Sequence, residues 1–134
     1  MTSAPSASLA DLLLVEADPA EAELATRCLQ SRVAVARDAR EALRSIETLA
    51  PRVVLLNPRL PGSDGMDLVE RLRADPRFRT IPVVVLSSDE SPSEVSRALR
   101  LGANSVVLKP VRFEALRTVL TEVESYWLGR HATG

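Results

Sequence analysis

Short apolar runs alternate with amphipathic segments along this chain, and the alternation constrains the fold more than any other feature of the sequence. Each run is continuous, without the interleaved polar residues of a strand that has a solvated face, so we expect strands buried on both faces of a parallel sheet. The segments between the runs repeat their apolar residues at helical spacing. The predicted strands are Leu12–Val15, Val33–Ala36, Val53–Leu56, Ile81–Leu86 and Val106–Leu108.

Strand–helix units of this kind predict an α/β fold, a doubly wound five-stranded parallel sheet flanked by five helices. A capping-box sequence, Ser91-Pro92-Ser93-Glu94, predicts that one of the helices begins at Pro92. In such sheets the functional crevice lies beyond the carboxyl ends of the strands. The residues that follow each predicted strand are therefore the candidates for function.

The composition indicates one small domain in a reducing compartment. The chain has 134 residues and a formal net charge of -1, so it has no broad positive field and we expect no nucleic-acid partner. Its only cysteine, Cys28, excludes an internal disulfide framework. No apolar run approaches the ~20 residues of a membrane span, so we expect no membrane partner and a cytoplasmic location. We predict a flexible lead over residues 1–8, a single domain over 9–128 and a tail over 129–134.

Polar side chains gather where the predicted strands end. They include a carboxylate pair, an amide, hydroxyls and an ammonium, supplied by Glu16, Asp18, Asn57, Ser87, Ser88 and Lys109. The nearby glycines Gly62 and Gly65 lack the spacing of a phosphate-binding loop, and no nucleophile stands next to a general base. We therefore expect no catalytic residue and no enzymatic activity.

Four segments resemble the motif blocks of response-regulator receiver domains from two-component signalling, in the same order and at the same spacing. These segments are Leu13–Pro19, Leu55–Gly65, Val84–Ser88 and Gly102–Pro110. The resemblance spans about residues 10–127 and implies a flavodoxin-like fold with strand order 2-1-3-4-5. Two further segments, Asp75–Pro82 and Tyr126–Leu128, resemble stand-alone receivers that are partnered with phytochrome-type histidine kinases.

The resemblance also implies a chemistry from which this sequence departs. In an active receiver, an acidic pair after the first strand and an aspartate after the third hold Mg²⁺, and that aspartate accepts a phosphoryl group from a kinase histidine. Here Glu16 keeps the first acidic position, whereas Ala17 replaces the second acid and Asn57 replaces the phosphoacceptor. The family's phosphate-sensing and switch positions correspond to Ser87, Val106 and Lys109, with valine in place of the usual aromatic residue.

The charges at these positions predict a pocket that does not need a metal. Ala17 offers no ligand, and the amide of Asn57 is a weak, neutral one. Glu16 and Lys109 can neutralise each other, with Asn57 bridging by hydrogen bonds, so the ammonium would serve as a fixed structural cation in place of the metal. We expect Mg²⁺ binding to be weak or absent, and any residual metal site to use Glu16, Asn57 and the backbone of Arg59.

Two neighbouring features bear on this pocket. Asp18 could shift by one position to replace the lost ligand, but Pro19 is expected to open the next helix and to hold Asp18 outside. The resemblance also implies a cis peptide bond between Lys109 and Pro110, which would place the ammonium over the crevice.

Two adjacent aromatic residues, Tyr126 and Trp127, end the last predicted helix. They could close the end of the sheet, or they could anchor an interface, because large aromatic side chains are effective contacts in association. The family pairs through the face built by its fourth and fifth helices and fifth strand, and the phytochrome-associated group is dimer-prone. We therefore predict a homodimer with Tyr126 and Trp127 at the interface.

Three functions remain open from the sequence. The one we favour is a stand-alone pseudo-receiver that docks to a sensor histidine kinase, possibly of the phytochrome type, or to another regulator, without aspartyl phosphorylation. The second is an active receiver in which Asp18 or another side chain accepts the phosphoryl group while Glu16 holds the metal. The third is an active receiver into which Ala17 and Asn57 were introduced by engineering.

Overall fold

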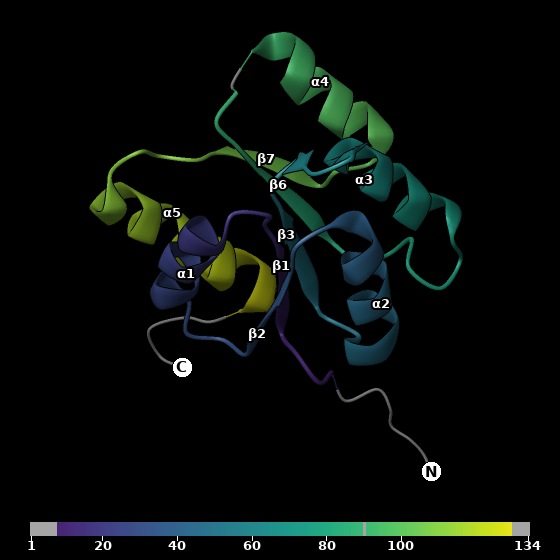
Figure 1. Ribbon diagram of the computed structural model, residues 1–134, viewed down its shortest axis with the longest axis horizontal. Coiled ribbons are helices and arrows are strands. Elements are labelled where there is room, and N and C mark those ends of the chain that lie inside the picture. Colours follow the sequence, from purple (N-terminus) through teal and green to yellow (C-terminus); the bar gives the residue numbers. More distant parts are fainter. Residues whose placement is uncertain (1–7, 90, 130–134) are drawn as a thin grey trace.

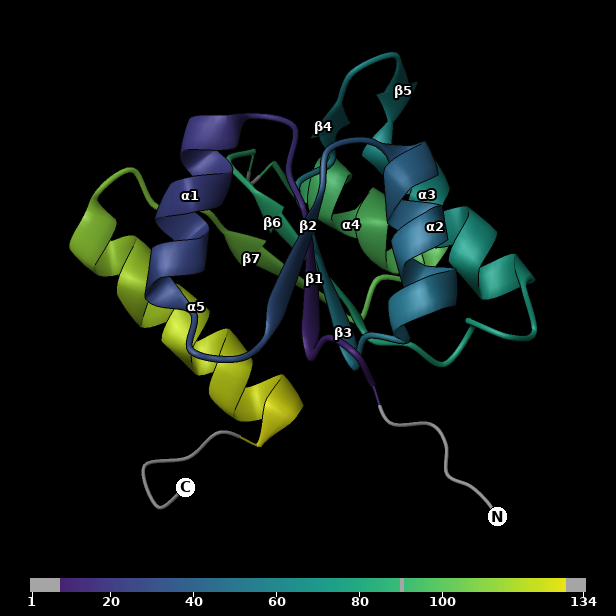
Figure 2. The same cartoon turned by 60° about the horizontal axis from the view of Figure 1, so that its bottom comes forward.

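The computed structural model describes residues 8–89 and 91–129. The predicted lead, apart from Ser8, and the predicted tail, apart from Gly129, lie outside the described residues. Figures 1 and 2 show a sheet with helices packed on both of its faces. The predicted α/β architecture is confirmed.

The main sheet consists of parallel strands in the order β2-β1-β3-β6-β7, which is the predicted order once the strands of a small hairpin are numbered too. The strand β6 begins at Val83 rather than at Ile81, because the Ile81 N–H donates to the Phe78 carbonyl in the preceding turn. The first three strands have the predicted bounds. The strands are β1 (Leu12–Val15), β2 (Val33–Ala36), β3 (Val53–Leu56), β6 (Val83–Ser87) and β7 (Ser105–Leu108).

The helices form two layers. On one face of the sheet lie α1 (Pro19–Cys28) and α5 (Phe113–Leu128). On the other face lie α2 (Ala39–Leu49), α3 (Gly65–Ala74) and α4 (Pro92–Leu101). This arrangement buries both faces of β1, β3 and β6, as their continuous apolar sequences predict.

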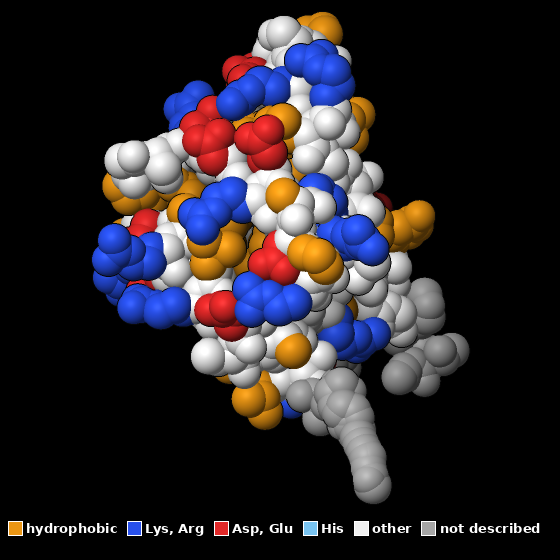
Figure 3. Space-filling model, turned by 90° about the vertical axis from the view of Figure 1, so that its right-hand side faces the viewer, with side chains coloured by type: hydrophobic (Ala, Val, Ile, Leu, Met, Phe, Trp, Pro, Cys, Tyr) orange, Lys and Arg blue, Asp and Glu red, His pale blue; other side chains and the backbone are white. Residues whose placement is uncertain are grey.

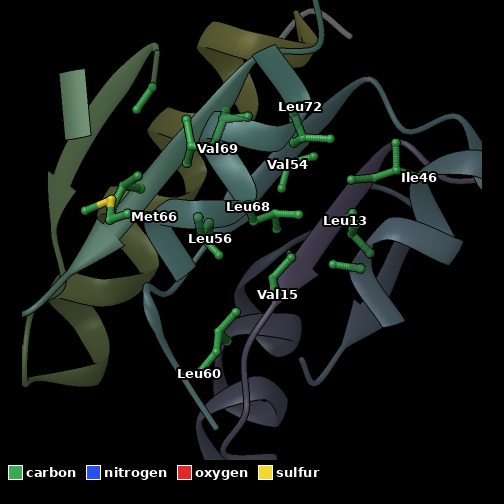
Figure 4. Packing of buried hydrophobic residues seen from close by; sticks show 14 of the residues in the cluster. Leu13, Val15, Ile46, Val54, Leu56, Leu60, Met66, Leu68, Val69 and Leu72 are labelled. Carbon is green, nitrogen blue, oxygen red and sulfur yellow. The ribbon is translucent and has the colours of Figure 1, made fainter. Parts of the chain in front are cut away.

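The sheet separates two apolar clusters. The cluster beneath α1 and α5 includes Leu12, Leu14, Leu55 and Leu120. Figure 4 shows the other cluster, in which side chains of β1 and β3 meet those of α2 and α3. Its labelled members are Leu13, Val15, Ile46, Val54, Leu56, Leu60, Met66, Leu68, Val69 and Leu72. Successive strand residues alternate between the two clusters, which fixes the register of the sheet.

Aspartates cap three of the helices. The carboxylates of Asp18, Asp38 and Asp64 accept hydrogen bonds from backbone N–H groups in the first turns of α1, α2 and α3. Such caps satisfy donors that have no partner within the helix, and they fix where the helix begins.

The fourth helix begins at Pro92, as predicted, but its capping box does not form. In a capping box the glutamate would accept from the N–H of Ser91. That N–H instead donates to Asp89 Oδ1 at 2.9 Å, and Glu94 lies 3.7 Å from Arg97. Asp89 and Arg97 therefore engage the donor and the acceptor of the bond between Ser91 and Glu94, and the Ser91 hydroxyl makes no capping bond either.

A two-stranded hairpin links β3 to α3. Its strands, β4 (Arg59–Leu60) and β5 (Ser63–Asp64), pair antiparallel around a turn at Gly62, which has a φ of 71°. The hairpin leads directly into α3, whose capping residue is Asp64. A Cβ on Gly65 would approach the Pro58 backbone to 2.7 Å, so glycine is required where the hairpin returns to the sheet. Figure 2 shows the hairpin projecting from the body of the domain.

Charges of both signs share the surface. On the face shown in Figure 3, basic and acidic side chains lie next to one another. Examples of such ion pairs are Arg77 with Asp75 and Glu47, and Arg97 with Asp64. Over the described residues, no helix combines the length and the apolar character that crossing a bilayer requires.

Candidate functional site

The candidate site lies at the carboxyl edge of the main sheet. Glu16 follows β1, Asn57 follows β3, Ser87 ends β6 and Lys109 follows β7. Parallel strands present all these ends at one edge of the sheet. The crevice forms between β1 and β3, where the strand order reverses: β2 lies on one side of β1, and the later strands lie on the other side. The structure brings Glu16, Asn57 and Lys109 into one hydrogen-bonded group, whereas Ser87 bonds elsewhere.

Glu16 is the centre of this group. Its side chain is 5% exposed, so its charge needs compensation from neighbouring groups. Oε1 accepts from Asn57 Nδ2 at 2.9 Å and from Lys109 Nζ at 3.4 Å, and Oε2 accepts from the Asp18 N–H at 3.1 Å. Both oxygens of this buried carboxylate are therefore occupied by protein donors.

Asn57 connects Glu16 to the hairpin. Its Nδ2 donates to Glu16, and its Oδ1 accepts from the Arg59 N–H at 3.1 Å. The predicted bridge from Glu16 to Lys109 through Asn57 differs from this arrangement: the amide bridges Glu16 and Arg59, because its oxygen closes a local turn. An amide can fill both roles because it carries donors on one side and an acceptor on the other.

Lys109 is held by two carboxylates. Besides Glu16 its Nζ pairs with Glu21 Oε1, and the lysine side chain is 14% exposed. Burial alone would lower the pKa of the ammonium, but the hydrogen bond to Glu21 and the charges of Glu16 and Glu21 outweigh it and raise the pKa above 10.5. Lys109 therefore stays charged across the physiological range.

The peptide bond between Lys109 and Pro110 is trans, as are all peptide bonds of the described residues, and the expected cis bond is wrong. An X–Pro bond prefers trans by only about 0.5–1 kcal/mol, much less than other peptide bonds do, so local context decides the isomer. The ammonium reaches Glu16 with the trans bond, so this position does not depend on the isomer.

Ala17 and Asp18 contribute no carboxylate to the pocket. Ala17 packs against the apolar cluster beneath α2 and α3. The Asp18 carboxylate accepts from the Ala20 N–H at 2.9 Å and from the Glu21 N–H at 3.4 Å, because Pro19 opens α1 directly after it. These capping bonds thus hold the Asp18 carboxylate at the N-terminus of α1, outside the pocket.

The two remaining predicted positions serve other contacts. Ser87 is buried, and its hydroxyl accepts from the Asp89 N–H at 3.0 Å and donates to the Asp89 carbonyl at 3.2 Å. Val106 is half-buried and packs against the apolar cluster on the α4 side of the sheet. Neither side chain hydrogen-bonds to Asn57 within the described part of the chain.

The oxygen donors of the crevice do not fit the magnesium ion that the receiver family binds. Mg²⁺ requires free oxygen ligands in octahedral geometry. Here Ala17 has no donor, both Glu16 oxygens and the Asn57 oxygen accept protein hydrogen bonds, and a cation already lies beside Glu16. The described residues form no cluster of three potential ligands from His, Cys, Asp and Glu.

Sequence reasoning missed Glu21. This residue lies in the first turn of α1, on the side of the crevice, and its carboxylate completes the pocket through Lys109. A signal was available: an acidic side chain in the first turn of a helix that begins beside the crevice. The direction of the Glu21 side chain, however, depends on how α1 is placed relative to β7, and the sequence does not specify that placement.

A hollow of about 250 Å³ lies beside the crevice, between the hairpin and α4, and its lining includes Arg59, Asp64, Ser87, Asp89 and Arg97. Another, of about 340 Å³, lies away from the crevice, between the start of β7 and the end of α5, and its lining includes Ser105, Glu122, Tyr126 and Trp127.

The two aromatic residues at the end of α5 differ in their surroundings. Tyr126 is 78% exposed, whereas Trp127 packs against the apolar cluster beneath α1 and α5. Their rings lie 4.8 Å apart in an edge-to-face arrangement. Trp127 thus helps to close the end of the sheet, and Tyr126 stands at the surface.

Comparison with known proteins shows the family of this chain. Residues 12–121 match the family of response regulator receiver domains. The chain is 36% identical over 129 residues to the probable methanogenesis regulatory protein FilR2 of Methanothrix harundinacea, covering 88% of this chain and 83% of that protein. The chain belongs to the response regulator receiver domain family.

Other relatives of this receiver domain carry additional sequence or come from light signalling. The DNA-binding response regulator MtrA of Mycolicibacterium smegmatis is 36% identical over 104 residues, which cover 75% of this chain and 44% of MtrA. The phosphorylated cyanobacterial phytochrome response regulator RcpA matches with a TM-score of 0.82 and 27% identity, over 93% of this chain and 96% of that chain. Its likeness supports the predicted resemblance to phytochrome-associated receivers.

A further structure shares the fold alone. RPA3017, a response regulator in red light signalling of R. palustris, matches with a TM-score of 0.82 at 22% identity, over 92% of this chain and 97% of that chain. The receiver fold therefore extends over nearly the whole of this chain.

Proposed function

We propose that this chain is a pseudo-receiver, a receiver domain that acts in two-component signalling by docking to another protein and not by accepting a phosphoryl group. Its partner would be a sensor histidine kinase, of phytochrome type or otherwise, or a second regulator. The likeness to RcpA, a phytochrome response regulator, favours a phytochrome-type kinase.

The observation that carries this proposal is the bonding of Asn57. Its amide donates to Glu16, which in turn accepts from Lys109, so an uncharged group stands at the acceptor position of a pocket already neutralised by a lysine. Phosphoryl transfer needs a nucleophilic oxygen and a metal that neutralises the charge on the transferred group. The amide nitrogen of Asn57 is not a nucleophile towards phosphorus, and the metal's ligands are otherwise engaged.

Asp18 is the alternative acceptor, and its bonding disfavours that role. Its carboxylate is held by two N–H groups of α1, whose hydrogen bonds would be lost if the side chain turned towards the crevice. The nearest carboxylate on the pocket floor, Glu16, is buried and occupied on both oxygens.

Intact-mass spectrometry of the native chain incubated with acetyl phosphate and Mg²⁺ tests the proposal. Acceptance would break the bond between phosphorus and the acetate oxygen, release acetate with the electron pair, and form a new P–O bond on a carboxylate. We expect no adduct of phosphoryl mass. A stoichiometric adduct would overturn the proposal, and peptide mapping of that adduct to Asp18 would support the active-receiver alternative.

The proposal includes a homodimer, for which the position of Tyr126 gives a specific contact. Its ring is exposed beside the hollow between β7 and α5, where an aromatic side chain of a second copy could be received. The partnership with a kinase and the pairing of two copies are separate parts of the proposal, and the dimer is tested below on its own.

A further inference from the structure

Glu21 is the least explained member of the crevice. It occupies the third position of α1, where a glutamate commonly bonds back to the N–H of the capping residue. Here that N–H, on Asp18, donates to Glu16 Oε2 at 3.1 Å, so Glu21 is released from the capping role. Its carboxylate pairs instead with Lys109.

The two carboxylates that hold Lys109 differ in exposure. Glu16 is 5% exposed and is fixed by three hydrogen bonds, whereas Glu21 is 40% exposed at the rim of the crevice. The ammonium therefore lies between a permanent partner in the floor and a partner that could move into solvent. Within the described residues no hydrogen bond joins Lys109 to Asn57, so the pair with Glu21 directs the lysine towards α1.

We propose that Glu21 is a positioning residue that holds the Lys109 ammonium on the α1 side of the crevice and withholds it from an anion at the Asn57 position. This inference rests on the proposed function and adds to it. Three residues, and not two, would then oppose phosphoryl transfer in the crevice. Ala17 and Asn57 lack the carboxylate oxygens, and Glu21 holds the Lys109 ammonium by an ion pair. Replacing Ala17 and Asn57 with aspartate would then restore only part of the activity of a working receiver.

The first test measures Lys109 directly, because it is the only lysine of the chain. The pKa of its ammonium and its rate of reductive methylation are followed by NMR in Glu21→Gln, with Glu23→Gln as the matched control. Glu23 lies on the same helix and pairs only with exposed Arg27, at 2.9 Å, among the described residues. Removing the charge of Glu21 should lower the Lys109 pKa by about one unit and raise its reactivity at fixed pH about tenfold.

The second test asks whether the ion pair of Glu21 with Lys109 slows phosphoryl transfer to a restored acceptor. The rate of adduct formation with acetyl phosphate and Mg²⁺ is compared between Ala17→Asp/Asn57→Asp and the same pair with Glu21→Gln added. We expect the triple variant to react about tenfold faster, and Glu21→Asp in the same background to fall between the two. Equal rates in the double and triple variants would overturn the inference, and so would the absence of any adduct in both. An unchanged pKa and methylation rate of Lys109 in the first test would overturn it too.

These outcomes are separable from the proposed function. Adduct formation on the native chain contradicts the pseudo-receiver itself. A native chain that stays unmodified, together with equal rates in the double and triple variants, contradicts only the role of Glu21. Thermal unfolding of each variant shows whether a lost signal reflects a lost fold.

Discussion

At the scale of single residues, the amide of Asn57 is the group that best matches its neighbour in the crevice, the carboxylate of Glu16. It lies 2.9 Å from a buried glutamate oxygen and donates a hydrogen bond to it. A carboxylate at the same place could only accept, so it would face Glu16 with the same charge. The amide of Asn57 therefore satisfies Glu16 in a way that a carboxylate could not.

Asn57→Asp alone should destabilise the chain near neutral pH by about 1–3 kcal/mol, since it places two carboxylates within hydrogen-bonding distance. The repulsion raises the pKa of the introduced aspartate in the folded state, so the penalty exists above the unfolded pKa of an aspartate and disappears as the pH falls below it. Denaturant unfolding near pH 7 and near pH 4 measures the change.

Asn104→Asp is the matched control for this substitution. The oxygen of Asn104 accepts from the Arg73 guanidinium at 2.7 Å and from the Val83 N–H at 2.9 Å, so a carboxylate there meets donors and a positive charge. Its stability should change little or rise. A loss equal to that of Asn57→Asp would show that the effect does not come from Glu16.

Lys109 makes a pH-dependent contribution of opposite direction. Its pKa is raised in the folded state, so the stabilisation is fully present below the unfolded value of 10.5 and is lost as the pH rises through the folded pKa. Lys109→Met should cost about 2–3 kcal/mol near pH 8, because the buried Glu16 loses its cation. The difference in unfolding free energy between the native chain and the variant should shrink near pH 11. A constant difference would assign the loss to packing.

At the scale of elements, the helices differ in how they begin. Three have an aspartate whose carboxylate accepts from the first turn, whereas the serine before α4 makes no such bond. The position of α4 therefore depends on other contacts, among them the ion pair of Arg97 with Asp64 at the start of α3. Glycine at Gly102 ends the helix with a φ of 115°, packed against Arg73.

Two cap substitutions should separate these cases. Asp38→Ala removes the bond from the Glu41 N–H at 2.8 Å and should cost about 1 kcal/mol. Ser91→Ala should cost less than about 0.5 kcal/mol, because its hydroxyl caps nothing. Urea denaturation of both variants measures the contrast, and similar losses would mean that Ser91 caps α4 in solution.

The elements also show what the sequence could predict and what it could not. The bounds of β1 and β3 follow from continuous apolar runs, because both strands are buried on both faces. The run Val33–Ala36 also has the predicted bounds, but the expected burial on both faces is wrong for it, because β2 lies at the edge of the sheet and is only partly buried. The capping box at Ser91 failed because Asp89, a neighbour outside the motif, took the N–H that the box requires. A local motif thus predicts the residue at which a helix begins better than it predicts which atoms form the capping hydrogen bonds there.

The candidate site divides in the same way. Strand order alone places Glu16, Asn57 and Lys109 at one edge, so their gathering could be predicted from the sequence. The partner Glu21 and the turn from Asn57 to Arg59 could not, since each depends on the direction of one side chain after the helices have packed.

At the scale of the whole molecule, the two helical layers leave one exposed aromatic ring, that of Tyr126, among residues 8–89 and 91–129. Trp127 is needed by the core, so substituting it would combine folding and association effects. Tyr126 is 78% exposed, so it is the cleaner probe of pairing between copies.

Sedimentation velocity should show a dimer for the native chain and a monomer for Tyr126→Ser, with the same unfolding transition for both. Val35→Thr is the control, since Val35 is also an exposed apolar residue but lies on β2, at the opposite edge of the sheet from β7 and Tyr126. A native chain that sediments as a monomer at high concentration would contradict the proposed homodimer.

The pairing of Glu16 with Lys109 joins positions that are 93 residues apart. A chain growing from its amino terminus makes the glutamate early and its counter-ion only when the last strand is complete. Until then the carboxylate would have to remain hydrated, because burying it unpaired is costly. Closure of the crevice over Glu16 therefore requires the last strand, and a truncated chain that ends before β7 would leave this carboxylate without its cation.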